Sequence, residues 1–317
     1  MKKRKLILDV DTGTDDAVAI MLAALHPDLD LLGVTTVNGN VEVEYGTNNT
    51  LRVLDFIDRS HVPVFQGLNK PMSRADFPIP RALKWNSGVH GNELDLPAPR
   101  TQKQDKSAVE FLVETYRATT EPITLVGVAP LSNIATAIAI EPKIIERADE
   151  LVLMGGAHHV GNTTPCAEMN IWADPDASAA VFRAGFKRLV CVPLDATHQA
   201  LVSRAVSDAL KALGTPAGIA AERFIGRRIT AYDANQPMDE LGHAPVHDAL
   251  CIAYLVDPTV ITTQFHHVAV ETQGELTIGR TVVDIARRGK GEPNCHFAFG
   301  ADRTKFCNFM LETLSRP

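Results

Sequence analysis

The 317-residue sequence has no cysteine framework. Its cysteines are odd in number, widely spread and never arranged as a C-x-x-C pair; they are Cys166, Cys191, Cys251, Cys295 and Cys307. This spacing argues against a disulfide-stapled scaffold and against a thiolate zinc site. We therefore expect a reducing compartment and a cytoplasmic location.

The sequence also lacks long apolar runs and an excess of positive charge. No stretch reaches the roughly 18 apolar residues that a membrane helix needs. The basic segment Met1–Lys5 is followed by a short apolar run that Asp9 interrupts, which does not fit a signal peptide. Lys and Arg number 31 against 38 Asp and Glu, and this net charge of −7 argues against a nucleic-acid or anionic membrane partner. A small-molecule ligand is expected instead.

What the sequence does contain is a repeated alternation of short apolar runs and longer segments with helical spacing. Because this alternation is typical of parallel sheets with crossover helices, it predicts a single α/β domain over residues 1–317, an open, mostly parallel sheet with helices on both faces. Pro, Gly, Asn and Asp cluster in two irregular stretches, which predicts active-site loops at about 71–100 and 223–245. The predicted strands are Leu6–Val10, Leu31–Val37, Val62–Phe65, Ile123–Val128, Leu151–Met154 and Leu189–Val192.

Four carboxylates lie within eight residues at the turn from the first predicted strand into the following helix: Asp9, Asp11, Asp15 and Asp16. Like charges this close repel one another unless a cation lies among them. A carboxylate that only caps the following helix is the alternative for Asp15 or Asp16. A hard divalent ion explains more of the cluster, and Ca²⁺ fits better than Mg²⁺, which prefers a small shell rich in water.

Two later segments offer partners for such an ion and for a polar ligand. Asp248 opens an apolar helix and is a candidate ligand, and the preceding His247 is a candidate proton donor, although a helix-capping Asp beside an unrelated His is an equal alternative. Glu168 and Asn170 alternate with apolar neighbours, which predicts an extended segment that presents both to sugar hydroxyls. A polar loop edge is the alternative for that pair.

Taken together, these clusters resemble the inosine–uridine preferring nucleoside hydrolase family along nearly the whole chain. The matching motifs follow in family order: Asp9-x-Asp11-x-Gly13-x-Asp15-Asp16, Thr35-Thr36-Val37-Asn38-Gly39-Asn40, Ala129-Pro130-Leu131-Ser132-Asn133, Leu153-Met154-Gly155-Gly156, Gly161-Asn162, Ala167-Glu168-Met169-Asn170, Asp174-Pro175 and Val246-His247-Asp248. Three positions depart from the family pattern: Thr12 replaces a proline, Ala129 a glycine and Met169 an aromatic residue. The flexible Met169 affects the expected shape of the ligand pocket rather than the reaction.

The resemblance implies an enzyme that hydrolyses the N-glycosidic bond of ribonucleosides around a bound Ca²⁺, assembled as a homodimer or homotetramer. It implies that Asp11 is the general base, with Asn40 near the attacking water and His247 as a proton donor to the departing base. The implied ion ligands are the side chains of Asp11, Asp16 and Asp248 and the carbonyl of Val128. The implied substrate contacts are Asp15, Met154, Asn162, Glu168, Asn170 and again Asp248.

The base-facing residues are expected from the two irregular stretches. His90 matches a family position near the base most closely, and the other candidates are Trp85, Phe224, Tyr232 and His243.

Two rival functions stay open. The Asp9-x-Asp11 pair also occurs in haloacid dehalogenase-like phosphatases, where Asp9 would be the nucleophile, but Gly13 stands where that family needs a threonine. The other rival is a non-catalytic protein that binds nucleosides or sugars through Ca²⁺.

Overall fold

The centre of the computed structural model, which describes residues 3–73, 89–289 and 291–317, is an eight-stranded sheet in the order β3-β2-β1-β4-β5-β6-β12-β9. All neighbouring strands are parallel except β9, which runs antiparallel to β12 at one edge. The strands are β1 (Arg4–Val10), β2 (Leu29–Thr36), β3 (Val64–Gln66), β4 (Ile123–Gly127), β5 (Ala148–Met154), β6 (Leu189–Val192), β9 (Ile261–His266) and β12 (Cys295–Ala301). The predicted fold class is confirmed, and each of the six predicted strands overlaps an observed strand.

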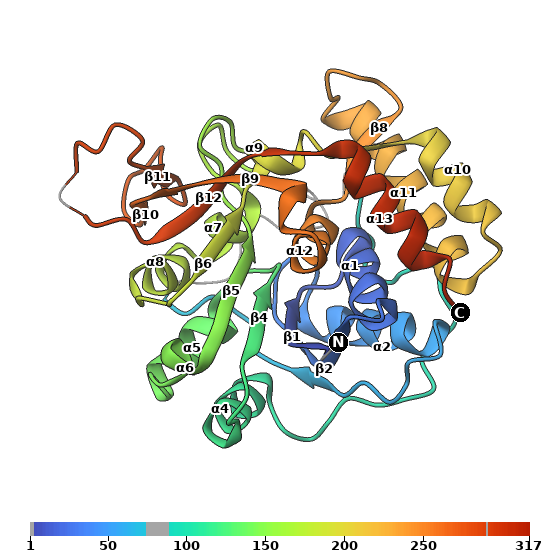
Figure 1. The fold of residues 1–317 in the computed structure, drawn as a ribbon, viewed down its shortest axis with the longest axis horizontal. Coiled ribbons are helices and arrows are strands. Elements are labelled where there is room, and N and C mark those ends of the chain that lie inside the picture. Colours follow the sequence, from blue (N-terminus) through green and yellow to red (C-terminus); the bar gives the residue numbers. More distant parts are fainter. Residues whose placement is uncertain (1–2, 74–88, 290) are drawn as a thin grey trace.

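Helices cover both faces of the sheet (Figure 1). One layer contains α1 (Thr14–Leu25), α2 (Val43–Phe56), α10 (Arg204–Ala212), α11 (Pro216–Asn235), α12 (His247–Val256) and α13 (Arg303–Leu314). The other contains α4 (Ala108–Ala118), α5 (Ser132–Ile140), α6 (Ile144–Arg147), α7 (Met169–Ala173) and α8 (Pro175–Arg183). Shorter elements are α9 (Leu194–Thr197), the 3₁₀ turn Pro258–Val260, and the strand pairs β7 (Leu201–Ser203) with β8 (His243–Pro245) and β10 (Val268–Val270) with β11 (Thr281–Val283).

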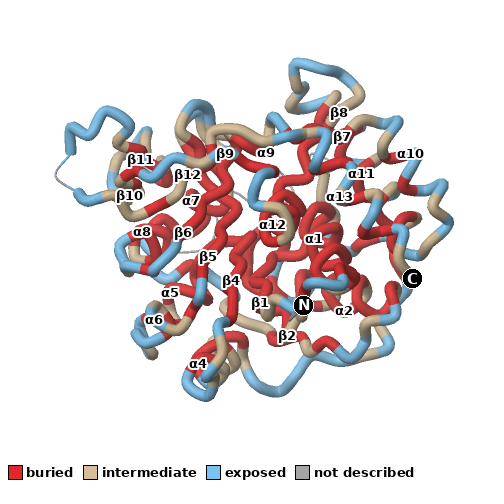
Figure 2. The backbone as a smooth tube through the Cα atoms, in the orientation of Figure 1, coloured by how far each residue is buried: buried red, intermediate tan, exposed pale blue. Residues whose placement is uncertain are grey.

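The two layers arise from alternation along each strand. In β1, Leu6, Leu8 and Val10 pack into the cluster that contains α1 and α12, whereas Ile7 packs into the cluster that contains α4 and α5. Side chains that alternate in this way, all apolar, are what a strand buried on both faces requires. Figure 2 shows the result as a continuous buried interior through the sheet and the adjoining helices.

The structure corrects one of the two predicted loops. Residues 223–235 belong to the long helix α11, so the prediction of a loop at 223–245 is wrong over that part. Proline at the end of the segment suggested irregular backbone, but α11 continues to Asn235 and ends just before Pro237. In the other stretch, 71–73 and 89–100 are irregular, and the remaining positions lie outside the described residues.

The topology brings the chemically interesting turns to one edge. Parallel strands β1, β2, β4 and β5 end at the same side, and the segments that follow them contain Asp11, Asn40, Val128 and Gly155. Ligands of such sheets bind at the carboxyl ends of the strands. Within the described ranges, the helices are too short or too polar to cross a bilayer.

Candidate active site

A cavity of about 440 Å³ opens at this edge, between the ends of the strands and the helices α11 and α12. This volume lies in the range of small-molecule sites. Its lining residues are Asp15, Gly39, Asn40, Val89, His90, Val128, Met154, Asn162, Thr163, Glu168, Met169, Asn170, Arg228, Ala231, Tyr232, Asn235, Gln236, His247 and Asp248. Most of the predicted substrate-contacting residues are among them.

Asp16 fixes the turn between β1 and α1. Its carboxylate accepts hydrogen bonds from the backbone N–H of Gly13 at 2.9 Å and of Asp11 at 3.2 Å, which confirms the helix-capping role. Burial, followed by the negative charge of Asp15, raises the pKa of Asp16 to about 6. Helix capping alone does not explain why Asp16 is buried beside another carboxylate. A single exposed carboxylate would cap the helix without the energetic cost of burial and charge repulsion.

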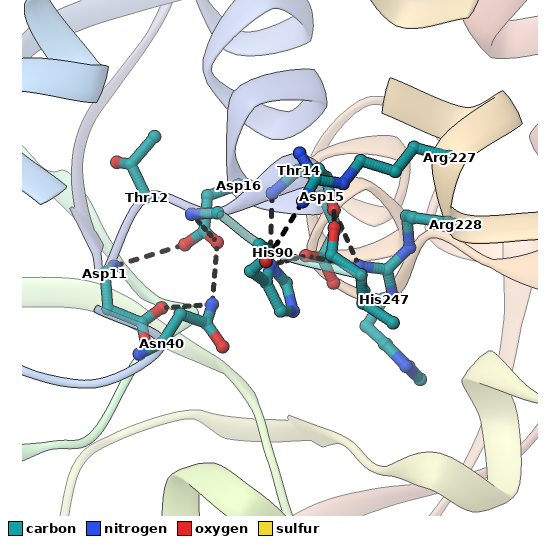
Figure 3. Close-up of polar contacts among 12 residues, drawn as sticks. Asp11, Thr12, Thr14, Asp15, Asp16, Asn40, His90, Arg227, Arg228 and His247 are labelled. Atoms are coloured by element: carbon teal, nitrogen blue, oxygen red, sulfur yellow. Dashed lines mark hydrogen bonds and ion pairs between the residues drawn. The ribbon is translucent and has the colours of Figure 1, made fainter. Parts of the chain in front are cut away.

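Asp11 lies beside Asp16, and Asn40 holds the two together (Figure 3). The backbone N–H of Asn40 donates to Asp11 Oδ2 at 2.6 Å, and its side-chain amide donates to Asp11 Oδ1 at 3.1 Å and to Asp16 Oδ2 at 3.2 Å. Burial, and then the charge of Asp16, raises the pKa of Asp11 well above its usual range. A carboxylate with a raised proton affinity at a fixed position suits general-base chemistry.

Three buried carboxylates form a group that could hold a metal ion: Asp15, Asp16 and Asp248, each with an oxygen within 4.8 Å of the other two. Burial raises the pKa of Asp248 well above its usual range, and the charges of Asp15 and Asp16 raise it further. Oxygen ligands of this kind are those that hard divalent cations take, so the donor set fits such an ion.

The group differs in one member from the predicted ligand set. Asp15 is in it and Asp11 is not, although Asp11 and Asp16 share the Asn40 amide. The Val128 carbonyl belongs to a residue that lines the cavity, and it accepts a hydrogen bond from the Asn170 amide at 3.0 Å.

Glu168 and Asn170 occupy a helix start rather than an extended segment, so that prediction is wrong. Glu168 precedes α7 as its N-cap and accepts from the backbone N–H groups of Gly156, Asn170 and Ile171. These donors explain why a carboxylate lies at this turn, and burial nevertheless raises its pKa to about 7. Both side chains still line the cavity.

The amide of Asn170 is oriented by two carbonyls, those of Val128 and Met154, which accept from its nitrogen at 3.0 and 3.1 Å. Its oxygen is buried and has no hydrogen-bond partner among the described residues. A buried acceptor without a partner is costly, and a ligand hydroxyl would satisfy it. Asn162 stands beside this group, and its side-chain oxygen accepts from the backbone N–H of Met169 at 3.0 Å.

His247 opens α12 on the opposite side of the cavity. Its Nε2 shares a hydrogen bond with the Tyr232 hydroxyl and its Nδ1 with the Thr197 hydroxyl, both at 2.8 Å. Burial, and then the charge of Arg228, lowers the pKa of His247 well below its usual range. The imidazole is therefore neutral near pH 7 and lies in a chain of hydroxyl groups along which a proton can move.

The predicted base-facing residues divide into three groups. His90 and Tyr232 line the cavity, and His90 Nδ1 accepts from the Thr14 backbone N–H at 3.2 Å. Phe224 is buried in the core instead, and His243 lies on β8 beside Glu240, so neither lines the cavity. Trp85 lies outside the described residues.

Sequence reasoning missed Arg228, which is 1% exposed and lines the cavity from α11. Its Nη1 lies 2.7 Å from Asp15 Oδ1 and 3.1 Å from the Thr14 hydroxyl, and its Nε donates to the Pro245 carbonyl at 2.8 Å. The adjacent Arg227 is exposed, and two consecutive arginines in a sequence are typical of a helix face in contact with solvent. The signal that could have found Arg228 is its helical spacing of four from Phe224 and Tyr232, both on the buried face.

The structure also bears on the phosphatase interpretation. Asp9 is fully buried, accepts from the Thr35 hydroxyl at 2.5 Å and the Asn133 amide at 2.8 Å, and is absent from the cavity lining. A nucleophile has to reach its substrate. The position of Asp9 therefore disfavours that rival.

Comparisons with known proteins found similar sequences and structures. A family model described as inosine–uridine preferring nucleoside hydrolase matches residues 6–308. The chain is 38% identical over 312 residues to the pyrimidine-specific ribonucleoside hydrolase RihA of Shewanella sp. (strain ANA-3), covering 98% of this chain and 96% of the relative. It is 41% identical over 286 residues to the pyrimidine-specific ribonucleoside hydrolase RihB of Escherichia coli (strain SE11), covering 90% and 88%.

Among solved structures, a purine-preferring ribonucleoside hydrolase from Gardnerella vaginalis superimposes with a TM-score of 0.89 at 32% identity, covering 98% of each chain. The similar proteins thus span both classes of nucleobase. All three of these proteins are named as ribonucleoside hydrolases.

Proposed function

This chain belongs to the inosine–uridine preferring nucleoside hydrolase family and hydrolyses the N-glycosidic bond of ribonucleosides, and we propose that it does so around a bound Ca²⁺ with Asp11 as the general base. The observation that carries the proposal is the group of buried carboxylates at a nucleoside-sized cavity. The products are ribose and the free nucleobase.

The proposed ion ligands are Asp11, Asp16, Asp248 and the Val128 carbonyl. Support comes from the proximity of Asp16 to Asp248, from the amide that joins Asp11 to Asp16, and from the place of Val128 in the lining. Calcium is favoured over magnesium because the protein itself offers many oxygen ligands. A bound Ca²⁺ would hold sugar hydroxyls and a water in place and make that water easier to deprotonate.

Asp11 takes the proton of the attacking water in this proposal. The two hydrogen bonds from Asn40 keep the carboxylate in one orientation for this step. Asn40 lines the cavity, which supports its place beside the attacking water. New C–O bond formation then accompanies cleavage of the bond between the sugar and the base.

We assign the ribose to one side of the cavity, with Asp248 near the ribose hydroxyls. This side is formed by Asp15, Met154, Asn162, Glu168 and Asn170. Sugar hydroxyls both donate and accept, so carboxylates and amides suit them. The unpartnered Asn170 oxygen supports this assignment. Hydrolysis passes through an oxocarbenium-like sugar, and negative groups at this side stabilise its developing positive charge.

The base is assigned to the side formed by His90, Tyr232 and His247. We propose that His247 delivers a proton to the departing base through the Tyr232 hydroxyl that it contacts. Because the imidazole is neutral, its Nε2 gives up a proton as its Nδ1 takes one from the Thr197 hydroxyl. Burial raises the pKa of Tyr232 to about 12, so this hydroxyl is protonated and able to donate.

One set of assays tests the proposal. Uridine, cytidine, inosine and adenosine, with their 2′-deoxy forms, are incubated with the wild type with and without a calcium chelator, and ribose release is measured. We expect release to fall sharply with the deoxy substrates and with the chelator. Asp11→Asn should lower kcat about 10²- to 10⁴-fold, whereas the exposed Asp208→Asn should not.

Three outcomes contradict the proposal. Ribose release that is indifferent to both the chelator and Asp11→Asn excludes the mechanism. Phosphate release from a phosphomonoester without nucleoside cleavage indicates a phosphatase. Nucleoside that binds tightly but is recovered intact indicates a binding protein.

We also propose a homodimer or homotetramer and a cytoplasmic location. Exposed apolar side chains gather around β10 and β11, where Leu276 is 82% and Val282 48% exposed, and patches of this kind suit association. All five cysteines are free, which supports a reducing compartment. Sedimentation velocity measures the subunit number.

A further inference from the structure

Arg228 is the one Arg or Lys among the described residues that line the cavity. Arginine keeps its charge at every pH at which the protein is folded. The remaining lining residues with formal charge near pH 7 are carboxylates: Asp15, Glu168 and Asp248. A permanent, buried cation at this place has no role in the mechanism given above.

Only part of the guanidinium is used by the fold. Nε is taken by the Pro245 carbonyl, and Nη1 by Asp15 and the Thr14 hydroxyl. Nη2 makes no hydrogen bond to any described residue, although the side chain is buried at the cavity wall. Nη2 is therefore available to donate to a ligand in the cavity.

The position of Arg228 lies between the two proposed halves of the substrate. Its partner Asp15 belongs to the proposed ribose side, and its guanidinium carbon is 5.5 Å from the ring centre of Tyr232 on the proposed base side. Figure 3 shows the side chain reaching Asp15 from α11, with Asp11 and Asn40 on the far side of the group. On this assignment, the guanidinium lies near the junction of the sugar and the base.

We propose that Arg228 is a catalytic residue that stabilises the departing nucleobase, with Nη2 donating to a ring oxygen or nitrogen next to the glycosidic nitrogen. This inference rests on the proposed function. As the bond between C1′ and the base breaks, its electron pair moves onto the base, while water supplies OH to C1′ and its proton to Asp11. The base then takes a proton from the Tyr232 hydroxyl, and Asp11 gives up the proton it has taken, so that the sum is nucleoside plus water giving ribose plus free base.

The physical reason is differential binding. The neutral base of the substrate gains little from a cation, whereas the base gains much once it carries the electron pair. A fixed, buried donor aimed at developing negative charge contributes about 10²- to 10³-fold in rate. As the bond breaks, the sugar becomes positive and the base becomes negative. The negative groups on the ribose side and the positive Arg228 on the base side match this separation of charge.

The test compares two substrates that share ribose and differ in the leaving group. Uridine requires help for its base to depart, whereas 4-nitrophenyl β-ribofuranoside releases a stable phenolate without help. We expect Arg228→Met to lower kcat/KM about 10²- to 10³-fold for uridine and less than about tenfold for the nitrophenyl riboside. The matched control is Arg223→Met, an exposed arginine of the same helix, which should leave both unchanged.

Arg228→Lys keeps the positive charge but lacks the planar set of N–H donors of the guanidinium. It provides a second test if Arg228→Met does not fold. For this variant we expect a smaller loss on uridine than for Arg228→Met. The rate ratio of 5-fluorouridine to uridine should rise above the wild-type ratio, because a more acidic base depends less on the missing donor. This ratio also serves if the wild type does not cleave the nitrophenyl riboside.

Equal losses on both substrates would overturn the inference, since they would mean that Arg228 acts on ribose through Asp15. An unchanged fluorouridine ratio in Arg228→Lys, or unchanged uridine cleavage in Arg228→Met, would do the same. Failure of the proposed function looks different: the wild type then releases no ribose from any nucleoside.

Discussion

Glu168 illustrates at the residue scale how a functional carboxylate is held at a thermodynamic cost. Burial raises its pKa from 4.5 to about 7. Because the folded pKa is the higher one, the folded state binds more protons than the unfolded state between these values. Stability from this group is therefore present below about pH 4.5 and is lost as the pH rises through about 7.

We predict that Glu168→Gln removes the loss of stability that the wild type shows as the pH rises. Relative to the wild type, the free energy of unfolding of the variant should increase by up to about 3 kcal/mol between pH 5 and pH 8, since one pKa unit corresponds to about 1.4 kcal/mol. Urea denaturation in the presence of a chelator measures it. Glu312→Gln, at a side chain that is 73% exposed, should show no such trend. Identical pH dependence in both variants would contradict the assignment.

The carboxylates and amides of the site could be predicted from the sequence because they lie in short motifs at the ends of strands. Asp15, Asp16 and Asp248 were all singled out, and the structure brings them together. Arg228 could not be predicted in this way, because its role comes from a contact across more than 200 residues with the β1–α1 turn. The same holds for Thr197, which is recognised only through its contact with His247.

At the scale of elements, the turn after β2 determines where the Asp11 carboxylate lies. Gly39 approaches it so closely that an added Cβ would lie 1.9 Å from Asp11 Oδ2. The glycine is not among those with a positive φ, so space rather than backbone conformation requires it. The next residue, Asn40, provides the hydrogen bonds that hold Asp11.

We predict that Gly39→Ala displaces Asp11 without removing any functional group. Displacement of a catalytic group by about 1 Å can cost about 10²-fold in rate, so we expect kcat/KM for uridine to fall by that order. Calcium affinity, measured by titration calorimetry, should fall as well. Gly226→Ala, in α11, meets only an ordinary contact of 3.7 Å and should retain activity. Normal kinetics in Gly39→Ala would show that Asp11 need not occupy this position.

Predictions of elements succeeded where periodicity was strong and failed where local chemistry decided. The apolar runs of β1 and β6 could be recognised directly, whereas β12, with its polar and aromatic mixture, was not predicted. The alternation around Glu168 resembled a strand, yet capping of α7 by that carboxylate makes the segment helical. Similarly, α11 extends through residues 223–235, for which the sequence predicts a loop.

At the scale of the whole molecule, the site joins segments far apart in the chain. Asp15 and Asp16 lie in the first turn of α1 and Asp248 in the first turn of α12, and the two helices pack in one layer over the sheet (Figure 1). The sheet order could be expected only in outline, since no local pattern specifies that β12 inserts between β6 and β9. Packing of the two helices therefore forces buried negative charges together, and a cation would relieve their repulsion.

We predict that Asp248→Asn raises the melting temperature of the protein in a chelator and abolishes most of its response to Ca²⁺. The wild type should gain about 5–10 °C when Ca²⁺ exceeds its dissociation constant about 100-fold, a stabilisation of about 2.7 kcal/mol. Differential scanning calorimetry with EDTA and with Ca²⁺ measures both effects, and Asp208→Asn, at an exposed position of α10, should behave like the wild type. If Asp248→Asn instead melts lower than the wild type in EDTA, Asp248 stabilises the start of α12 as an ordinary acidic residue of a first helical turn. The ion would then not be what makes three buried carboxylates tolerable in this fold.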